Sequence, residues 1–228
     1  MNTIQFFIFR FSSVPLVVAC LVGLVQYRRY EATRRYLVWL SWLALLVTAV
    51  AMWFQHQHRP NLFLAPIDAA IEFTLLGLMY RQALWPLAVA RYLPVCIGLF
   101  VVGTALTSWP QLGTVEFSPI QHFTESVAMV ALVVLYYRRI INARPVSLAP
   151  LEREPMFWIS AGVLLYFSAN SLIFLTSNFL LLHYRELSKN VWAIHALLYS
   201  FLNGFYIVAL CLPPLPAPVA GPPGITQS

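Results

Sequence analysis

The chain has 228 residues, of which 60% are hydrophobic and 10% are charged, and its mean hydropathy is +0.74. Soluble domains carry about 25% charged residues, so this composition excludes an ordinary soluble domain and indicates an integral membrane protein. The net charge of +6 at pH 7 comes from arginines in short loops. These indicate membrane topology and contact with anionic lipid rather than nucleic-acid binding.

Seven apolar segments are each about as long as a helix that crosses a bilayer core of about 30 Å. They run over residues 11–26, 36–54, 62–80, 87–108, 122–137, 156–182 and 191–212. The sequence therefore predicts an all-α polytopic fold in which residues 1–212 form one domain of seven transmembrane helices. Residues 213–228 are rich in Pro and Gly, which predicts a disordered cytoplasmic tail.

The basic residues predict the orientation of this domain. The loops after the first, third and fifth segments hold ten of the fourteen basic residues: Arg28, Arg29, Arg34, Arg35, Arg81, Arg91, Arg138, Arg139, Arg144 and Arg153. By the positive-inside rule these loops are cytoplasmic. This puts the N-terminus outside and the C-terminus inside the bacterial inner membrane.

Glycines and tryptophans predict how the helical frame is packed. Gly98, Gly103, Gly162 and Gly204 are small residues that are expected to let neighbouring helices approach closely. Trp192 lies near the predicted outer end of its segment, where we expect it to belong to an interfacial aromatic belt.

The third segment, within PIDAAIEFTLLGLMYR, contains two carboxylates. Asp68 and Glu72 are four residues apart, so they share one face of a helix. An ionised carboxylate in hydrocarbon is costly, and it must therefore face water, a partner or a ligand inside the bundle. Asp68 has a second interpretation, as an N-terminal cap or first-turn acid of a helix that begins later.

Three further segments carry polar side chains in the same outer half of the predicted membrane. They are His122 and Glu125 in the fifth segment, Asn170 in the sixth, and His195, Tyr199 and Asn203 in the seventh. Intramembrane ionisable residues must face the bundle interior. We therefore expect these side chains and the two carboxylates of the third segment to line one outward-opening ligand-binding pocket.

The residue types in this pocket leave several chemistries open. Glu72, His122, Glu125 and His195 are candidate ligands for a divalent metal such as zinc or manganese. The same groups with Tyr and Asn also suit a polar or cationic small ligand, or a proton relay. In the structural alternatives, His122 is a hydrated interfacial residue, and Glu125 and His195 each make an ordinary hydrogen bond between helices.

Two seven-helix families can be compared with these residues. A retinal protein needs a lysine in its last helix, and the only lysine of the sequence is Lys189, which precedes that helix, so retinal is excluded. The stretch HALLY resembles the HxxxH pair of the alkaline ceramidase and adiponectin receptor superfamily of zinc hydrolases. It departs from that pattern because Tyr199 stands where the second histidine would be.

The stretches IEFTLLGLMYR, FWISAGVLLYFSAN and WAIHALLYSFLN, with the helix of Glu125, resemble a group of small bacterial seven-helix membrane proteins. The resemblance covers roughly the third to the seventh segment, and Glu72, Glu125, Asn170 and His195 match its polar positions. Such proteins look like membrane sensing partners of separate histidine kinases. The resemblance implies a sensor with a histidine kinase or another cytoplasmic partner.

Three functions are consistent with the sequence. The leading hypothesis is a receptor-like sensor, monomeric or homodimeric, which binds a small ligand or metal in the outer pocket and signals through the arginine-rich loops. The alternative is a metal-dependent intramembrane lipid hydrolase in which Glu72 or Glu125 is the base. A small transporter is disfavoured because the sequence shows neither inverted repeats nor paired broken helices.

Overall fold

The computed structural model describes residues 5, 7–8, 11–108, 119–143 and 150–213, which contain seven α-helices and no β-strand. The helices are α2 (Val14–Gln26), α3 (Ala32–His56), α4 (Leu64–Leu84), α5 (Ala88–Ser108), α6 (Pro119–Ala143), α7 (Pro155–His183) and α8 (Arg185–Cys211). Each predicted segment corresponds to one helix, but α8 begins at Arg185, so Lys189 lies within this helix and the prediction that it precedes the last helix is wrong. The predicted tail 213–228 lies outside the described residues, apart from Pro213.

Five of these helices, α3, α5, α6, α7 and α8, are long and apolar enough to cross a membrane. Helix α2, with 13 residues, is too short to meet this criterion. Helix α4 does not meet it because every 18-residue stretch of this helix contains three charged residues, Asp68, Glu72 and Arg81. The predicted all-α class and the membrane-protein character are confirmed at this level. Seven spans and their orientation remain predictions.

Prolines mark the ends of several helices. Pro155 is the first residue of α7, a position where the missing N–H would have had no partner within the helix. Pro15 lies in the first turn of α2, and Pro86 directly follows Trp85, the C-cap of α4. Proline has no backbone N–H to donate within a helix, so these residues help to define where the helices begin and end.

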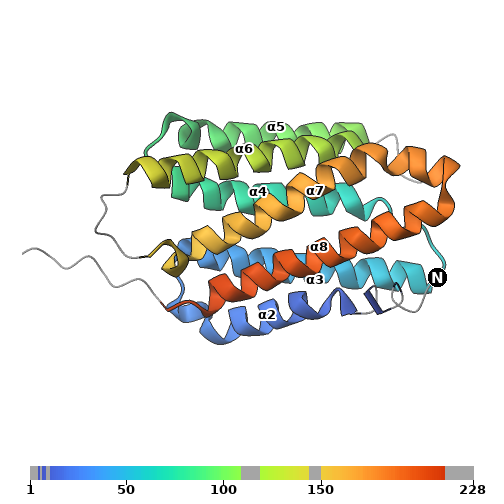
Figure 1. Ribbon diagram of the computed structural model, residues 1–228, viewed down its shortest axis with the longest axis horizontal. Helices are drawn as coiled ribbons and strands as arrows, with labels where there is room; N and C mark the ends of the chain where they lie inside the picture. The colour runs from blue at the N-terminus through green and yellow to red at the C-terminus, as the bar shows by residue number, and fades with distance from the viewer. Residues whose placement is uncertain (1–4, 6, 9–10, 109–118, 144–149, 214–228) are drawn as a thin grey trace, which may run out of the picture.

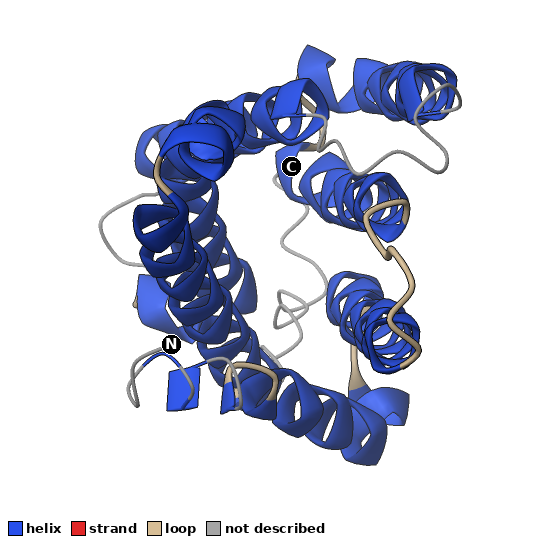
Figure 2. Cartoon of the chain, turned by 90° about the vertical axis from the view of Figure 1, so that its right-hand side faces the viewer, coloured by secondary structure: helices blue, strands red, loops and turns tan. Residues whose placement is uncertain are grey.

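Six of the helices form a ring (Figures 1 and 2). Helix α2 packs against α3 and α8, α4 packs against α3 and α6, and α7 packs against α6 and α8. This order places α4 across the ring from α8. Helix α5 lies outside the ring and packs mainly against α4.

Successive helices run in opposite directions, so the ring has two distinct ends (Figure 1). One end contains the α3–α4 connection and the starts of α4, α6 and α8; we call it the α3–α4 end. The opposite end is called the arginine end. It holds nine of the eleven described arginines: Arg28, Arg29, Arg34, Arg35, Arg81, Arg91, Arg138, Arg139 and Arg153. The other two, Arg59 and Arg185, lie at the α3–α4 end.

The apolar core fills the half of the ring that is nearer the arginine end. Leu37 of α3, Met79 of α4, Met129 of α6, Ile159 of α7 and Leu210 of α8 are fully buried and belong to one cluster. Five ring helices are therefore joined by close apolar packing in this half, and most of their ionisable intrahelical residues lie in the other half.

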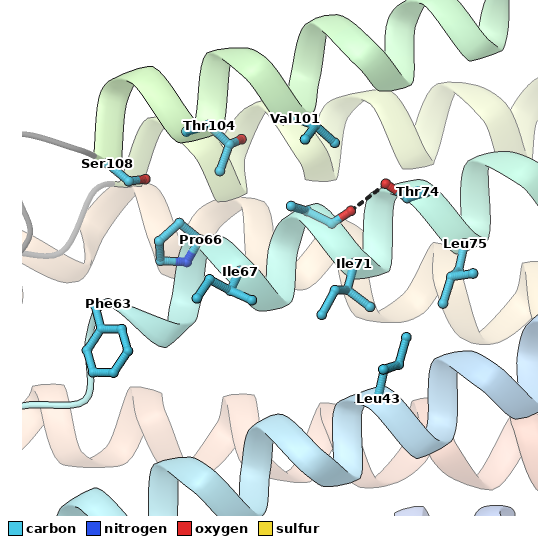
Figure 3. A pocket seen from close by; sticks show the side chains of 12 residues that line it. Leu43, Phe63, Pro66, Ile67, Ile71, Thr74, Leu75, Val101, Thr104 and Ser108 are labelled. Carbon is cyan, nitrogen blue, oxygen red and sulfur yellow. Dashed lines mark hydrogen bonds between the residues drawn. The ribbon is translucent and has the colours of Figure 1, made fainter.

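The outer surface carries an apolar groove of about 550 Å³ between α3, α4 and α5. Figure 3 shows Ile67 and Ile71 of α4 in this groove, with Leu43 of α3 and Val101 of α5 on either side. Ile67 is 47% exposed. Such a surface is consistent with a lipid environment, because exposed apolar side chains are stable in contact with hydrocarbon.

The predicted role of the glycines is right at one position and wrong at three. A Cβ added to Gly98, Gly103 or Gly204 would meet no heavy atom within 4 Å, so these glycines do not mediate close helix contacts. At Gly162 of α7, a Cβ would lie 2.8 Å from the Cβ of Phe205 in α8. The two helices can approach here only because residue 162 has no side chain.

Gly162→Ala should therefore destabilise the protein, by about 1–3 kcal/mol for an overpacked contact. The matched control is Gly204→Ala, which adds the same methyl group to the neighbouring helix in open space and should leave stability unchanged or slightly higher. Thermal unfolding of the purified proteins in one detergent measures both. Equal melting temperatures for the two variants would contradict the close contact.

At the arginine end, two side chains hold the end of α8. The guanidinium of Arg34, which is 2% exposed, donates a hydrogen bond to the carbonyl of Leu212 at 2.6 Å, and the hydroxyl of Tyr30 donates to the carbonyl of Leu210 at 2.8 Å. The last carbonyls of a helix have no partner within the helix. Tyr30 and Arg34 therefore cap α8 from the start of α3.

Arg34→Gln should loosen this cap, and backbone amides in the last turn of α8 should exchange with deuterium faster, because local opening costs less. Arg35→Gln is the matched control: Arg35 is exposed and lies over the ring of Tyr27 rather than at the end of α8. Exchange measured by mass spectrometry compares the three proteins. Unchanged exchange in Arg34→Gln would show that the cap does not hold the helix end.

Candidate functional site

A cavity of about 340 Å³ lies within the ring on the side of the α3–α4 end. Its walls come from α3, α4, α6, α7 and α8, and residues around the α3–α4 connection, including Gln55 and Asn61, also line it. This volume is in the range of pockets that hold small organic molecules. The cavity is thus placed where the sequence predicts a polar pocket.

Three carboxylates line the cavity. Asp68 and Glu72 come from α4, one helical turn apart, and both are half-buried; Glu125 comes from α6 and is 1% exposed. The N-cap of α4 is Phe63 and the helix begins at Leu64. Asp68 therefore lies in the second turn, and its alternative interpretation as an N-terminal cap is wrong.

Two histidines line the same cavity, each with a polar partner. The Nδ1 atom of His122 lies 3.4 Å from Oε2 of Glu125, one turn further along α6. The Nδ1 atom of His195 lies 3.0 Å from Oδ1 of Asn170 on α7. An amide oxygen only accepts hydrogen bonds, so with this amide orientation the proton is on Nδ1 of His195.

Some buried polar atoms around the cavity have no hydrogen-bond partner in the structure. They are Oε1 of Glu125 and Nδ2 of Asn170, on side chains that are 1% and 0% exposed. Buried polar groups in proteins are nearly always paired, and each exception requires an explanation. Of the two residues, Glu125 is the one that lines the cavity, and its Oε1 is buried without a partner.

Aromatic side chains surround the histidines. The ring of His195 lies 5.4 Å from Trp192, 5.6 Å from Phe174 and 5.8 Å from Tyr166, measured between centroids. The ring of His122 stacks on Phe174 at 4.5 Å. The cavity wall formed by α7 and α8 is therefore largely aromatic, and we call Tyr166, Phe174, Trp192 and His195 the aromatic wall.

Tyr199 and Asn203 occupy a separate small void of about 10 Å³ beside the cavity, which they share with Asp68 and Glu72. The amide of Asn203 donates back to the carbonyl of Tyr199 at 2.9 Å. These two residues are near the carboxylates but do not line the main cavity.

The predicted metal ligands Glu72, His122, Glu125 and His195 all line the main cavity. Across the part of the chain that the structure describes, no three His, Cys, Asp or Glu side chains are grouped so that they could hold a metal ion. The described geometry therefore gives no support to a metal site or to the metal-dependent hydrolase.

Comparisons with protein-family models, with curated proteins and with solved structures find no match to this chain. Function must therefore be inferred from the cavity itself.

The sequence pattern predicts His195 as a pocket residue but not the other three members of the aromatic wall. Trp192, which its position predicts in an interfacial belt, lines the cavity. A signal was present in the spacing: Tyr166 and Phe174 stand four residues before and after Asn170, and Trp192 stands three residues before His195. Residues at these spacings share a helical face with the polar residue.

Asn170→Ala should destabilise the protein by about 0.5–1.5 kcal/mol, because His195 loses its partner on the neighbouring helix and interhelical hydrogen bonds in membranes are of this size. The matched control is Ser171→Ala, since the hydroxyl of Ser171 bonds the carbonyl of Ser168 in its own helix. Thermal unfolding measures both variants. If they unfold at the same temperature, the bond between α7 and α8 contributes nothing to stability.

Proposed function

We propose that this protein is a receptor-like membrane sensor that binds a small polar ligand in the cavity and signals to a separate partner at the arginine end. The observation that carries the proposal is the composition of the cavity wall. Three carboxylates and two imidazoles from three helices line one cavity, and none of the described lining residues is Lys or Arg. Ionisable groups in a membrane domain are kept where a ligand, an ion or water meets them.

The distribution of arginines supports an outward-facing cavity. Nine of the eleven described arginines lie at the end of the bundle opposite the α3–α4 connection, whereas Arg59 lies in that connection and Arg185 at the start of α8. Loops that are richer in arginine stay on the cytoplasmic side. The proposed orientation has an external N-terminus, an internal C-terminus and seven spans in a bacterial inner membrane. The resemblance to sensing partners of histidine kinases suggests a kinase as the partner.

Helix α8 offers a route between the two ends. Trp192 and His195 near its start line the cavity, and its last carbonyls are held by Tyr30 and Arg34 at the arginine end. A ligand changes a conformational equilibrium only if it binds one arrangement better than another. In the proposed mechanism, a ligand that contacts both α4 and α8 favours one position of α8, and the cap transmits this position to the start of α3.

The first experiment presents the small-molecule fraction of a bacterial lysate, and of culture medium, to the purified protein in lipid nanodiscs. A ligand at 100 times its Kd stabilises by about 2.7 kcal/mol, which is several degrees in melting temperature for about 200 residues. We expect a shift for wild type and little or none for Glu72→Gln, since the carboxylate is a ligand contact.

The control variant is Glu152→Gln, which removes an exposed acid at the arginine end and should respond like wild type. Hydrogen exchange at residues 28–36 provides the second readout, and it should change on binding. A shift that is equal in all three proteins would contradict the site, and binding without any change at residues 28–36 would contradict the sensor.

A further inference from the structure

We infer that the ligand of this cavity is an organic cation, an amine or quaternary ammonium compound with an apolar part. The inference rests on the proposed function and adds the chemical class of the ligand. It is carried by two independent features of the cavity: three carboxylates with no Lys or Arg among the described lining residues, and an aromatic wall on the other side of the ring.

The carboxyl groups of the cavity favour a cationic ligand, because a bound positive charge stabilises their ionised form. Asp68, Glu72 and Glu125 contribute three carboxylates, and no Lys or Arg is found among the described residues that line the cavity. Oε2 of Glu125 lies near His122, whereas its Oε1 is buried without a partner. A buried carboxylate oxygen is costly unless a donor or a positive charge meets it. An ammonium group supplies both.

The aromatic wall selects an organic cation. Trp192, Phe174 and Tyr166 gather around His195 with ring centroids 5.4–5.8 Å away from it. The faces of aromatic rings attract cations, tryptophan most strongly, and cages of such rings recognise quaternary ammonium groups. The same rings also provide apolar surface for the remainder of the molecule.

The positions of the two features fit one molecule. In the ring, α4 with Asp68 and Glu72 lies across from α8 with Trp192 and His195, so a ligand between these helices contacts both. The cavity volume of about 340 Å³ suits a molecule with an ammonium head and one ring. An inorganic ion would instead need several side chains converging on one point, and no group of three is present among the described residues.

The test uses four small probes that share a phenyl ring and differ in charge. They are 2-phenylethylammonium, its N,N,N-trimethyl derivative, the neutral 2-phenylethanol and the anionic 3-phenylpropanoate, with manganese chloride as an inorganic cation. Binding to the full chain in nanodiscs at neutral pH is measured by isothermal titration and by the shift in melting temperature.

We expect the two ammonium probes to bind saturably and much more tightly than the alcohol and the carboxylate. Glu72→Gln should weaken it by about tenfold or more through the lost charge, and Trp192→Leu by about tenfold through the lost cation–π contact, with Trp192→Phe intermediate. Glu152→Gln, an acid at the arginine end, should bind like wild type. The ratio of ammonium to alcohol affinity is the decisive quantity, because a variant that only loosens the fold would weaken all probes together.

Several results would overturn the inference. Binding of the alcohol or the carboxylate as tightly as the ammonium probes, binding of manganese alone, or no saturable binding of any ammonium probe to folded wild type would each exclude an organic-cation site. The lysate experiment distinguishes these failures from failure of the proposed function: a stabilising fraction that acts through Glu72 would retain the sensor with a different class of ligand.

Discussion

The fold depends on the constraint that carboxylates inside an apolar bundle must face its interior. Helix α4 shows this most clearly. Asp68 and Glu72 line the cavity, whereas Ile67 and Ile71, one residue before each, line the groove on the outer surface (Figure 3). Because hydrocarbon cannot solvate a carboxylate, only one rotation of α4 about its axis is tolerable. Helix α5 packs against the outer face of α4, outside the ring.

The same constraint divides the bundle into two halves that differ in packing and polarity. Toward the arginine end, buried side chains such as Leu37, Met79 and Ile159 pack closely and supply most of the apolar burial. Toward the α3–α4 end, the ring tolerates a cavity, and Oε1 of Glu125 is buried beside it without a partner. Unpartnered buried groups are destabilising, so the tightly packed half provides the stability that allows the other half to hold a site. Helix α8 belongs to both halves.

Much of this arrangement could be predicted from the sequence, because length and hydropathy alone define helices in a membrane protein. The segment 87–108 corresponds to α5 (Ala88–Ser108), and 156–182 to α7 (Pro155–His183). The depth of each polar residue follows from the rise of 1.5 Å per residue, which is why Glu72 and His195 could be placed in the same half. The order of helices around the ring could not be predicted, since it depends on side-chain packing between segments that have no distinguishing pattern.

The aromatic wall was missed for a more general reason. In a water-soluble protein the apolar face of a helix points inward, so an aromatic residue in the sequence indicates which face is buried. In a membrane helix, apolar residues are suited both to the lipid and to the protein interior. Trp192 and Phe174 therefore carry no directional information by themselves. Only a polar neighbour on the same face supplies it, as His195 does for Trp192 and Asn170 does for Phe174. In an apolar helix, the residues three and four positions from each buried polar group are consequently the ones that define the rest of its site.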